Sequence, residues 1–178
     1  MIELLARFRV ALGWVFAPLV LILANPSAES ILVGAIVALA GEGIRIWAAG
    51  HLNKSREVTS SGPYQFFAHP LYVGSSVMGA GLALASANAI AAALIAFYLA
   101  VTLRAAIRNE EAFLRRAFGD QYELYKRQRV VDRERPFSAR LAIANREYRA
   151  LAGLAAAMLL LALKATYNGS FWRTGAGP

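Results

Sequence analysis

Two short segments of the chain contain the residue types that a chemical site needs. Residues 62 to 74, Gly-Pro-Tyr-Gln-Phe-Phe-Ala-His-Pro-Leu-Tyr-Val-Gly, place a turn, an aromatic pair and His69 at the mouth of an apolar stretch. Residues 110 to 125 begin with the acidic pair Glu110 and Glu111 and contain two tyrosines near their end. Histidine and glutamate side chains exchange protons, and polar groups from two segments can close over one ligand. The combination indicates a membrane enzyme with its chemistry at the membrane edge.

The composition identifies the surroundings in which these segments must be positioned. Of the 178 residues, 58% are hydrophobic, and the mean hydropathy of +0.45 is well above that of soluble proteins. A membrane helix needs roughly 20 apolar residues to cross a hydrocarbon core about 30 Å thick. Five segments approach that length: 10–24, 31–50, 70–85, 89–103 and 150–163. We therefore predict an all-α polytopic membrane bundle of about five transmembrane helices, with residues 1–178 forming a single domain.

Most basic residues lie in the regions that flank these five segments. Lysine and arginine occur before the first segment, between the second and third, and at twelve positions from Arg104 to Arg149. The positive-inside rule places these regions, and hence the N-terminus, in the cytoplasm. We expect a bacterial-type inner membrane. The net charge of +8 is explained by the positive-inside topology and by contacts with lipid headgroups, so we expect no nucleic-acid binding. The first segment also resembles a secretory signal, but we expect a retained helix, because the charge pattern requires an odd number of crossings.

Two features of the composition exclude whole classes of chemistry. The chain has no cysteine, and therefore no disulfide, thiolate nucleophile or cysteine-ligated metal. Its two histidines, His51 and His69, are too few for a histidine-rich metal site, and no spacing of acidic residues suggests one. We therefore expect no bound metal.

The chain becomes charged after the fourth apolar segment but keeps a helical pattern. One stripe recurs at spacings of seven, four and seven: Ile107, Leu114, Phe118 and Tyr125. Glu111 lies on or beside this stripe, where a carboxylate needs a partner. We expect Gly119 to end the helix and Asp120 to begin a second one, which folds Tyr122 and Tyr125 back onto the site. Tyrosines in such a place can also be interfacial anchors, and that alternative stays open.

His69 stands directly before the third apolar segment. Pro70 at the first helical position fixes the entry of that helix, so His69 is held at its partly positive N-terminal end. That end suits an anionic or carbonyl group, and Tyr72 adds an aromatic face with a hydroxyl. The alternative is structural, since a histidine before a proline can simply cap the helix or hydrogen-bond a neighbouring loop.

Five short motifs in order carry a resemblance to a known superfamily. They are Ser61-Gly-Pro-Tyr64, His69-Pro-Leu-Tyr72, Glu110-Glu111-x-x-Leu114, Phe118-Gly119 and Tyr122-x-x-Tyr125. Over residues 41–130 the chain resembles the isoprenylcysteine carboxyl methyltransferases and phospholipid methyltransferases. The resemblance implies a multi-helix membrane protein that binds S-adenosylmethionine at the cytoplasmic face, where cytoplasmic helices complete the cofactor site. It also implies a lipophilic acceptor that reaches the methyl group from the bilayer.

The same resemblance assigns cofactor contacts to particular positions of this chain. They are Arg56, Glu57, Val58, Thr59, Tyr64, His69, Pro70, Leu71, Tyr72 and Glu110. The cofactor has a sulfonium, an ammonium, a carboxylate, ribose hydroxyls and a flat adenine. Electron-rich groups suit the sulfonium, an acid suits the ammonium, and hydrogen-bond donors suit the carboxylate. Hydrogen-bond acceptors suit the ribose hydroxyls, and aromatic walls suit the adenine.

Two residues are candidates for catalysis in a reaction that depends mainly on positioning. Methyl transfer is an in-line displacement, in which holding donor and acceptor close replaces much of the need for acid–base chemistry. If the acceptor is an amine, Glu111 or His69 is placed to remove its proton. If the acceptor is a carboxylate, no base is needed, but a cation must hold the acceptor.

The chain departs from the superfamily at two positions. Members often have an arginine directly before His-Pro, where this chain has Ala68. The carboxyl methyltransferases also have an arginine four residues before the first glutamate, where this chain has Ala106. Arg104 and Arg108 are the candidate substrate-binding residues that replace these arginines, and a purely topological role explains them equally well.

Two other functions share parts of the pattern. Membrane sterol and steroid reductases, which bind NADPH, also carry a Tyr and a His-Pro-x-Tyr motif, although the pair Glu110-Glu111 followed by Phe118-Gly119 favours methyl transfer. A non-catalytic membrane scaffold or small transporter would explain the helices and basic loops. It gives no reason for the paired acids and the aromatic helix.

Overall fold

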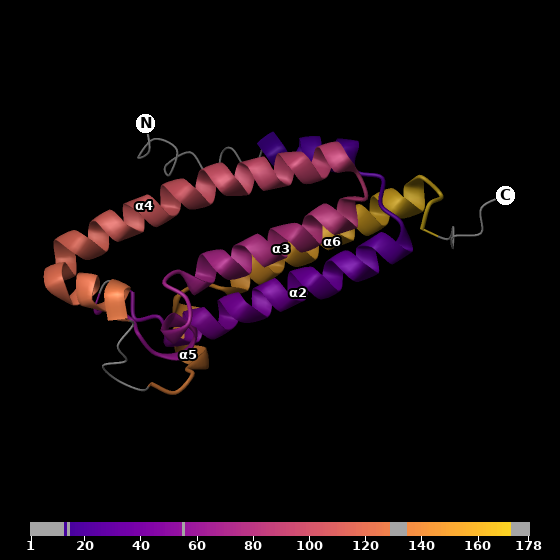
Figure 1. Cartoon of the computed structure of the whole chain (residues 1–178). Coiled ribbons are helices and arrows are strands. Elements are labelled where there is room, and N and C mark those ends of the chain that lie inside the picture. The colour runs from indigo at the N-terminus through magenta and orange to yellow at the C-terminus, as the bar shows by residue number, and fades with distance from the viewer. Residues whose placement is uncertain (1–12, 14, 55, 129–134, 172–178) are drawn as a thin grey trace.

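The protein is an elongated bundle of helices that lie along a common direction (Figure 1). This computed structural model describes residues 13, 15–54, 56–128 and 135–171, and all regular structure in those residues is helical. The four main helices are α2 (Ala28–His51), α3 (Pro70–Ser86), α4 (Ala89–Gln128) and α6 (Tyr148–Tyr167). The 3₁₀ turn η1 (Gly62–Gln65) precedes α3, the short helix α5 (Ala139–Ala144) precedes α6, and residues 15–23 are also helical. The predicted all-α class is confirmed.

Three helices are long and apolar enough to cross a membrane by length and composition, namely α2, α4 and α6. The helix α3 is apolar but has only 17 residues. The first predicted segment, 10–24, is described only from residue 13 onward, and its described part is helical from residue 15 to residue 23. The structure is therefore consistent with a membrane bundle, in which α3 and the first segment are the shorter members.

The helices α2 and α3 form the most closely packed pair in the bundle. A Cβ atom added to Gly41 would lie 2.4 Å from the backbone nitrogen of Met78, and one added to Gly81 would lie 2.4 Å from that of Ala38. Such distances leave no room for a side chain, so the two backbones touch at small residues, as membrane helices often do. The entry of α3, where His69 lies, is thereby held firmly against α2.

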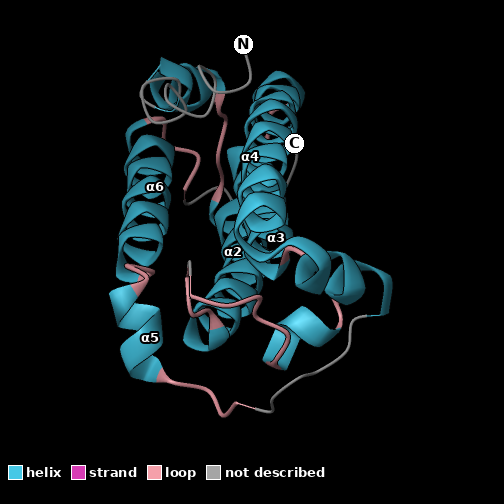
Figure 2. Ribbon diagram, turned by 90° about the vertical axis from the view of Figure 1, so that its left-hand side faces the viewer, coloured by secondary structure: helices cyan, strands magenta, loops and turns pink. Residues whose placement is uncertain are grey.

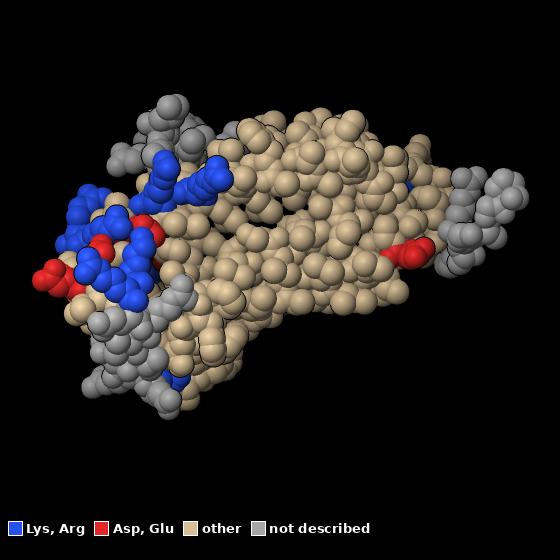
Figure 3. All heavy atoms as spheres, viewed as in Figure 1, with Lys and Arg blue, Asp and Glu red and all other residues tan. Residues whose placement is uncertain are grey.

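The helix α4 bends sharply and returns toward the bundle (Figures 1 and 2). The bend lies at Gly119, whose φ of 46° and ψ of −121° suit glycine alone among the common residues. At 1.5 Å per residue, the helix from residue 89 to residue 118 measures about 45 Å, longer than a hydrocarbon core of about 30 Å. About 20 residues from Ala89, enough for such a core, reach residue 108, so the part of α4 that carries Glu110 and Glu111 extends beyond a membrane-spanning length. Lysine and arginine gather at this end of the molecule, and the middle of the visible face is almost free of charge (Figure 3).

Candidate active site

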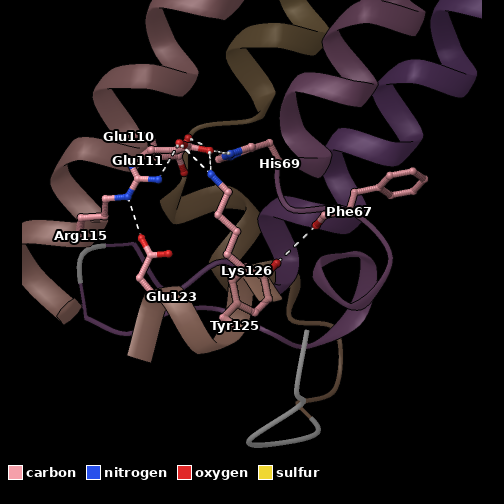
Figure 4. A network of polar contacts seen from close by, with 8 residues as sticks. All are labelled: Phe67, His69, Glu110, Glu111, Arg115, Glu123, Tyr125 and Lys126. Carbon is pink, nitrogen blue, oxygen red and sulfur yellow. Dashed lines mark hydrogen bonds and ion pairs between the residues drawn. The ribbon is translucent and has the colours of Figure 1, made fainter. Parts of the chain in front are cut away.

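His69 and the two acidic residues of α4 meet at the charged end of the bundle (Figure 4). The Nε2 atom of His69 lies 3.4 Å from Oε1 of Glu111, and its Nδ1 atom lies 3.9 Å from Oε2 of Glu110. The His69 side chain is 14% exposed, because α3 begins directly behind it. The two segments singled out in the sequence thus come together at their histidine and their acidic pair.

Glu111 has the partners that its predicted inward position requires. The Nζ atom of Lys126, on the returning part of α4, donates to both carboxylate oxygens at 3.0 and 3.1 Å. Arg115 lies 3.6 Å from the same carboxylate and also donates to Glu123 at 2.8 Å, across the bend (Figure 4). Charge pairing therefore joins the two halves of α4 directly beside His69.

The returning helix packs its tyrosines into the protein. Tyr122 and Tyr125 are 1% and 6% exposed, and they form a cluster with Ala48 and Tyr64. The hydroxyl of Tyr125 donates to the carbonyl of Tyr64 at 2.7 Å and holds the turn η1 in place. The predicted fold-back is confirmed, and both rings lie inside the fold instead of at the headgroups. Burial, and then the Glu110 carboxylate, raise the pKa of the Tyr64 phenol, so Tyr64 stays a hydrogen-bond donor.

The segment from Arg56 to Thr59 runs past this tyrosine cluster. Val58 packs against the cluster, and the buried Thr59 accepts a hydrogen bond from the backbone N–H of Asn53 at 3.3 Å. Glu57 pairs with Arg135 at 2.5 Å, and Arg56 is exposed. The segment therefore lies close to Tyr64, but its charged side chains do not reach His69 and the acidic pair.

The Glu111 contacts predict a dependence of stability on pH. Burial raises the pKa of the Glu111 carboxyl, but hydrogen bonds from Lys126 and His69 outweigh burial, and the pKa lies below its ordinary value of 4.5. A lowered pKa in the folded state stabilises the fold above the unfolded-state value, and this contribution is lost as pH falls through the folded value. We expect the melting temperature to fall below about pH 4.5 and the fall to be smaller in Glu111→Gln. Thermal unfolding between pH 3.5 and 7 measures this, with the exposed Glu29→Gln as control; equal curves for Glu111→Gln and wild type would contradict it.

Two cavities lie beside this cluster, on either side of the contact between α3 and α4. The inner cavity, of about 800 Å³, is lined by residues of all four main helices and of the segment 15–21. Its lining includes Arg45, Leu71, Tyr72, Ser75, Tyr98 and Glu147. The outer groove, of about 640 Å³, lies between α3 and α4, and its lining includes Phe67, Ala68, His69, Ser76, Ala100 and Arg104. Figure 3 shows the surface hollowed between α4 and the helices below it.

The two cavities share part of their lining. Both are lined by Tyr72, Gly79, Ile95, Leu99 and Leu103. Leu99 fills the space that a side chain at residue 79 would occupy, since a Cβ on Gly79 would lie 2.1 Å from the Cδ1 atom of Leu99. The contact between Gly79 and Leu99 therefore lies between the outer groove and the inner cavity.

Some of the candidate residues line these cavities and others do not. Arg104 lines the outer groove together with Ala68 and His69, whereas Arg108 is exposed and lines neither cavity. Ala106 lines the inner cavity. Of the expected cofactor contacts, His69, Leu71 and Tyr72 line a cavity; Pro70 is buried behind them, and Tyr64, Glu110 and the segment 56–59 lie outside both.

A buried charged cluster inside the bundle went unnoticed in the sequence. Arg45 lies between Glu42 at 3.5 Å and Glu147 at 2.9 Å, and Glu42 is 1% exposed. The available signal was the pair Glu42-x-x-Arg45 inside an apolar segment, because ionisable residues within membrane helices are rare and usually have a role.

The chain is thus a helical membrane protein with a histidine and acidic cluster where two cavities meet its charged end. Comparison with known proteins agrees with this description: the phospholipid methyltransferase family matches residues 31–121, from α2 to the bend of α4, and the chain belongs to that family. The resemblance inferred from the motifs is confirmed.

Three curated proteins are each similar to about half of the chain. The nickel-cobalt-cadmium resistance protein NccN of Alcaligenes xylosoxydans xylosoxydans is 35% identical over 89 residues, which are 49% of this chain and 40% of NccN. The cobalt-zinc-cadmium resistance protein CzcN of Cupriavidus metallidurans is 34% identical over 93 residues, 51% of this chain and 43% of CzcN. The protein-S-isoprenylcysteine O-methyltransferase of Schizosaccharomyces pombe is 31% identical over 88 residues, 49% of this chain and 37% of that enzyme. The matches thus span about two fifths of each relative, and no solved structure matches the chain.

Proposed function

We propose that the protein transfers a methyl group from S-adenosylmethionine to a lipophilic acceptor at the cytoplasmic face of the membrane. The observation that carries the proposal is the position of His69, which lies against the acidic pair of α4 and also lines the outer groove. Donor and acceptor would meet at this residue, one from the charged end and one from the bilayer. Membership of the phospholipid methyltransferase family supports the type of reaction.

Glu110 is the acid best placed to hold the donor. Its side chain is 35% exposed, and the contact recorded for its carboxylate within the described residues is His69 at 3.9 Å, which is too long for a hydrogen bond. Glu111 is already occupied by Lys126 and Arg115. A partly exposed carboxylate with only this long contact among the described residues suits the ammonium and sulfonium of S-adenosylmethionine.

The remaining donor contacts come from the segments on either side of Glu110. Tyr64 and Tyr72 offer aromatic walls, and the start of α3 at Pro70 and Leu71 offers a helix N-terminus for a carboxylate. The segment of Arg56, Glu57, Val58 and Thr59 packs against the tyrosine cluster through Val58 and would close the site on that side.

The chain's own residues orient the acceptor and handle its charge. S-adenosylmethionine supplies a sulfonium methyl, whose carbon bonds to the acceptor oxygen or nitrogen as the carbon–sulfur bond breaks and leaves its electron pair on sulfur. The outer groove would align the acceptor with His69, and this alignment supplies much of the rate. For an amine acceptor, His69 or Glu111 takes the released proton; for a carboxylate acceptor, Arg104 at the same groove holds the negative charge.

The acceptor class follows from the groove and the relatives. The outer groove is lined mainly by small and apolar side chains of α3 and α4, which suit a hydrocarbon chain. The matched family and the yeast relative are named for phospholipid and isoprenylcysteine methylation, and both names point to lipids. The positive end of the molecule, where the site lies, would face the cytoplasm.

Binding of S-adenosylhomocysteine tests the proposal through Glu110. We expect saturable binding to the detergent-purified protein and a dissociation constant about 10- to 100-fold higher in Glu110→Gln, because a charge-assisted hydrogen bond contributes about 1.5–3 kcal/mol. Isothermal titration calorimetry measures both values, and His69→Ala should also weaken binding.

The matched control is Glu29→Gln, since Glu29 is an exposed acid in the first turn of α2. It should bind S-adenosylhomocysteine like wild type. Binding of NADPH without binding of S-adenosylhomocysteine would overturn the proposal in favour of a reductase, and binding of neither would favour a scaffold.

A further inference from the structure

Arg45 makes polar contacts with residues of α2, α3 and the start of α6. Its Nη2 atom donates to both carboxylate oxygens of Glu147, at 3.1 and 2.9 Å. Its Nη1 atom donates to the hydroxyl of Ser75 and approaches the carbonyl of Leu71 at 3.5 Å. One guanidinium therefore joins three helices, because Ser75 and Leu71 lie in the first two turns of α3 and Glu147 directly precedes α6.

The aliphatic part of Arg45 is fixed as firmly as its charged end. A Cβ added to Gly74 would lie 2.6 Å from the Cγ atom of Arg45, so the arginine stem packs directly on the α3 backbone. The Arg45 side chain is 17% exposed, and the Glu42 and Glu147 side chains are 2% and 9% exposed. A side chain that is held at both ends in this way has little freedom to adopt another rotamer.

The cluster is costly, which indicates that it has a purpose beyond stability. Two carboxylates share one guanidinium in the interior of an apolar bundle, and the oxygens of Glu42 receive no hydrogen bond from any described residue. Replacing buried ion pairs by apolar side chains often leaves proteins as stable or makes them more stable. Ionisable residues inside membrane bundles are accordingly most often functional.

Arg45 contacts the first turns of α3, directly after His69. Tyr72 lies next to Leu71, and its backbone N–H donates to the carbonyl of His69 at 3.0 Å. The rings of Tyr72 and His69 lie 5.8 Å apart, and Tyr72 lines both cavities. A shift at Leu71 and Ser75 would therefore be passed directly to His69 and Tyr72.

We propose that Arg45 is a positioning residue: it ties the start of α6 to the first turns of α3 and so sets how His69 and Tyr72 face the donor and the acceptor. The inference rests on the proposed function for the ligands involved. Arg45 acts from the inner side of α3, whereas the acidic pair of α4 contacts His69 from the other side. The acidic pair thus contacts His69 itself, and Arg45 holds the helical turn that follows it.

Histidine NMR gives a direct test, because His51 and His69 are the two histidines of the chain. With ¹³Cε1-labelled histidine in nanodiscs, we expect Arg45→Met to move the His69 signal by more than its linewidth and leave the His51 signal in place. A merely structural defect would move both signals. Lys164→Met is the matched control, because Lys164 donates to the carbonyls of Leu21 and Ile22 at the other end of the bundle. It should move neither signal.

A second variant covers the case in which Arg45→Met does not fold. Ser75→Ala removes one contact of Arg45 and should move the His69 signal in the same direction by a smaller amount. An unchanged His69 signal in the folded variants, or equal shifts of both histidines, would overturn the proposal. Titration of S-adenosylhomocysteine separates the two proposals: Arg45→Met should raise its dissociation constant about three- to tenfold, by up to about 1.4 kcal/mol. If wild-type protein does not bind S-adenosylhomocysteine but Arg45→Met still shifts the His69 signal, the proposed methyl donor is wrong and the positioning role of Arg45 stands.

Discussion

Replacing Gly119 by alanine is expected to detach the returning helix from the site and to weaken donor binding. Gly119 has φ 46° and ψ −121°, and a non-glycine residue in such a conformation costs about 1–3 kcal/mol. No atom lies within 4 Å of the Cβ that the substitution adds, so the whole cost comes from the backbone. Alanine relieves it by letting α4 continue straight.

A straightened α4 would break two sets of contacts at once. Lys126 would leave Glu111, and Tyr125 would leave the Tyr64 carbonyl. We expect a lower melting temperature and a loss of S-adenosylhomocysteine affinity of about 5- to 150-fold, which is the strain of about 1–3 kcal/mol converted to a ratio. Thermal unfolding and calorimetry measure the two effects.

Two other glycines provide matched controls for Gly119→Ala. Gly153 lies on the exposed surface of α6, with equally open space around its Cβ, and Gly153→Ala should leave stability unchanged or slightly raised. Gly169 has a φ of 68° beyond the far end of α6, so Gly169→Ala should cost stability without affecting donor binding. Wild-type affinity in Gly119→Ala would show that the bend does not build the site.

The bend and the entry of α3 could be predicted because each depends on a local signal. Glycine next to aspartate interrupts a helical stripe at residue 119, and proline at residue 70 can only begin a helix. His69 and Glu111 were singled out near such signals, and Glu111 was expected to need a partner. The sequence did not say that His69, at 3.4 Å, and Lys126, at 3.0 Å, are its partners.

The pairing of Arg45 with Glu147 could not be predicted, because the two residues are 102 apart in the chain and the facing sides of their helices are not local properties. Glu147 follows a short turn after α5 that the sequence does not distinguish from a continuous helix. The two cavities depend on how far α4 stands from α3, which in turn depends on the pairing of Gly79 with Leu99. A hydrophobic pattern identifies which residues are buried but does not identify which of them touch.

Filling the space at Gly79 is expected to stop methyl transfer while leaving donor binding intact. A valine there would place its Cβ 2.1 Å from the present position of Leu99 Cδ1, so Leu99 must move into the outer groove or the inner cavity. Overpacking of this kind costs about 1–3 kcal/mol, and the displaced leucine would occupy the volume proposed for the acceptor chain. We expect transfer of label from S-[methyl-³H]adenosylmethionine into an extract of the host membrane lipids to fall at least tenfold in Gly79→Val.

A compensating substitution separates a blocked groove from a damaged fold. In Gly79→Val/Leu99→Ala the smaller residue 99 makes room for the valine, and both transfer and thermal stability should recover. The donor affinity should stay within twofold of wild type in both variants, because Glu110 and Tyr64 lie outside the cavities that these substitutions alter. Undiminished transfer in Gly79→Val would mean that the acceptor does not reach His69 between α3 and α4. A loss of transfer that Leu99→Ala does not restore would mean that Gly79 serves the packing of the helices and not the passage of a lipid.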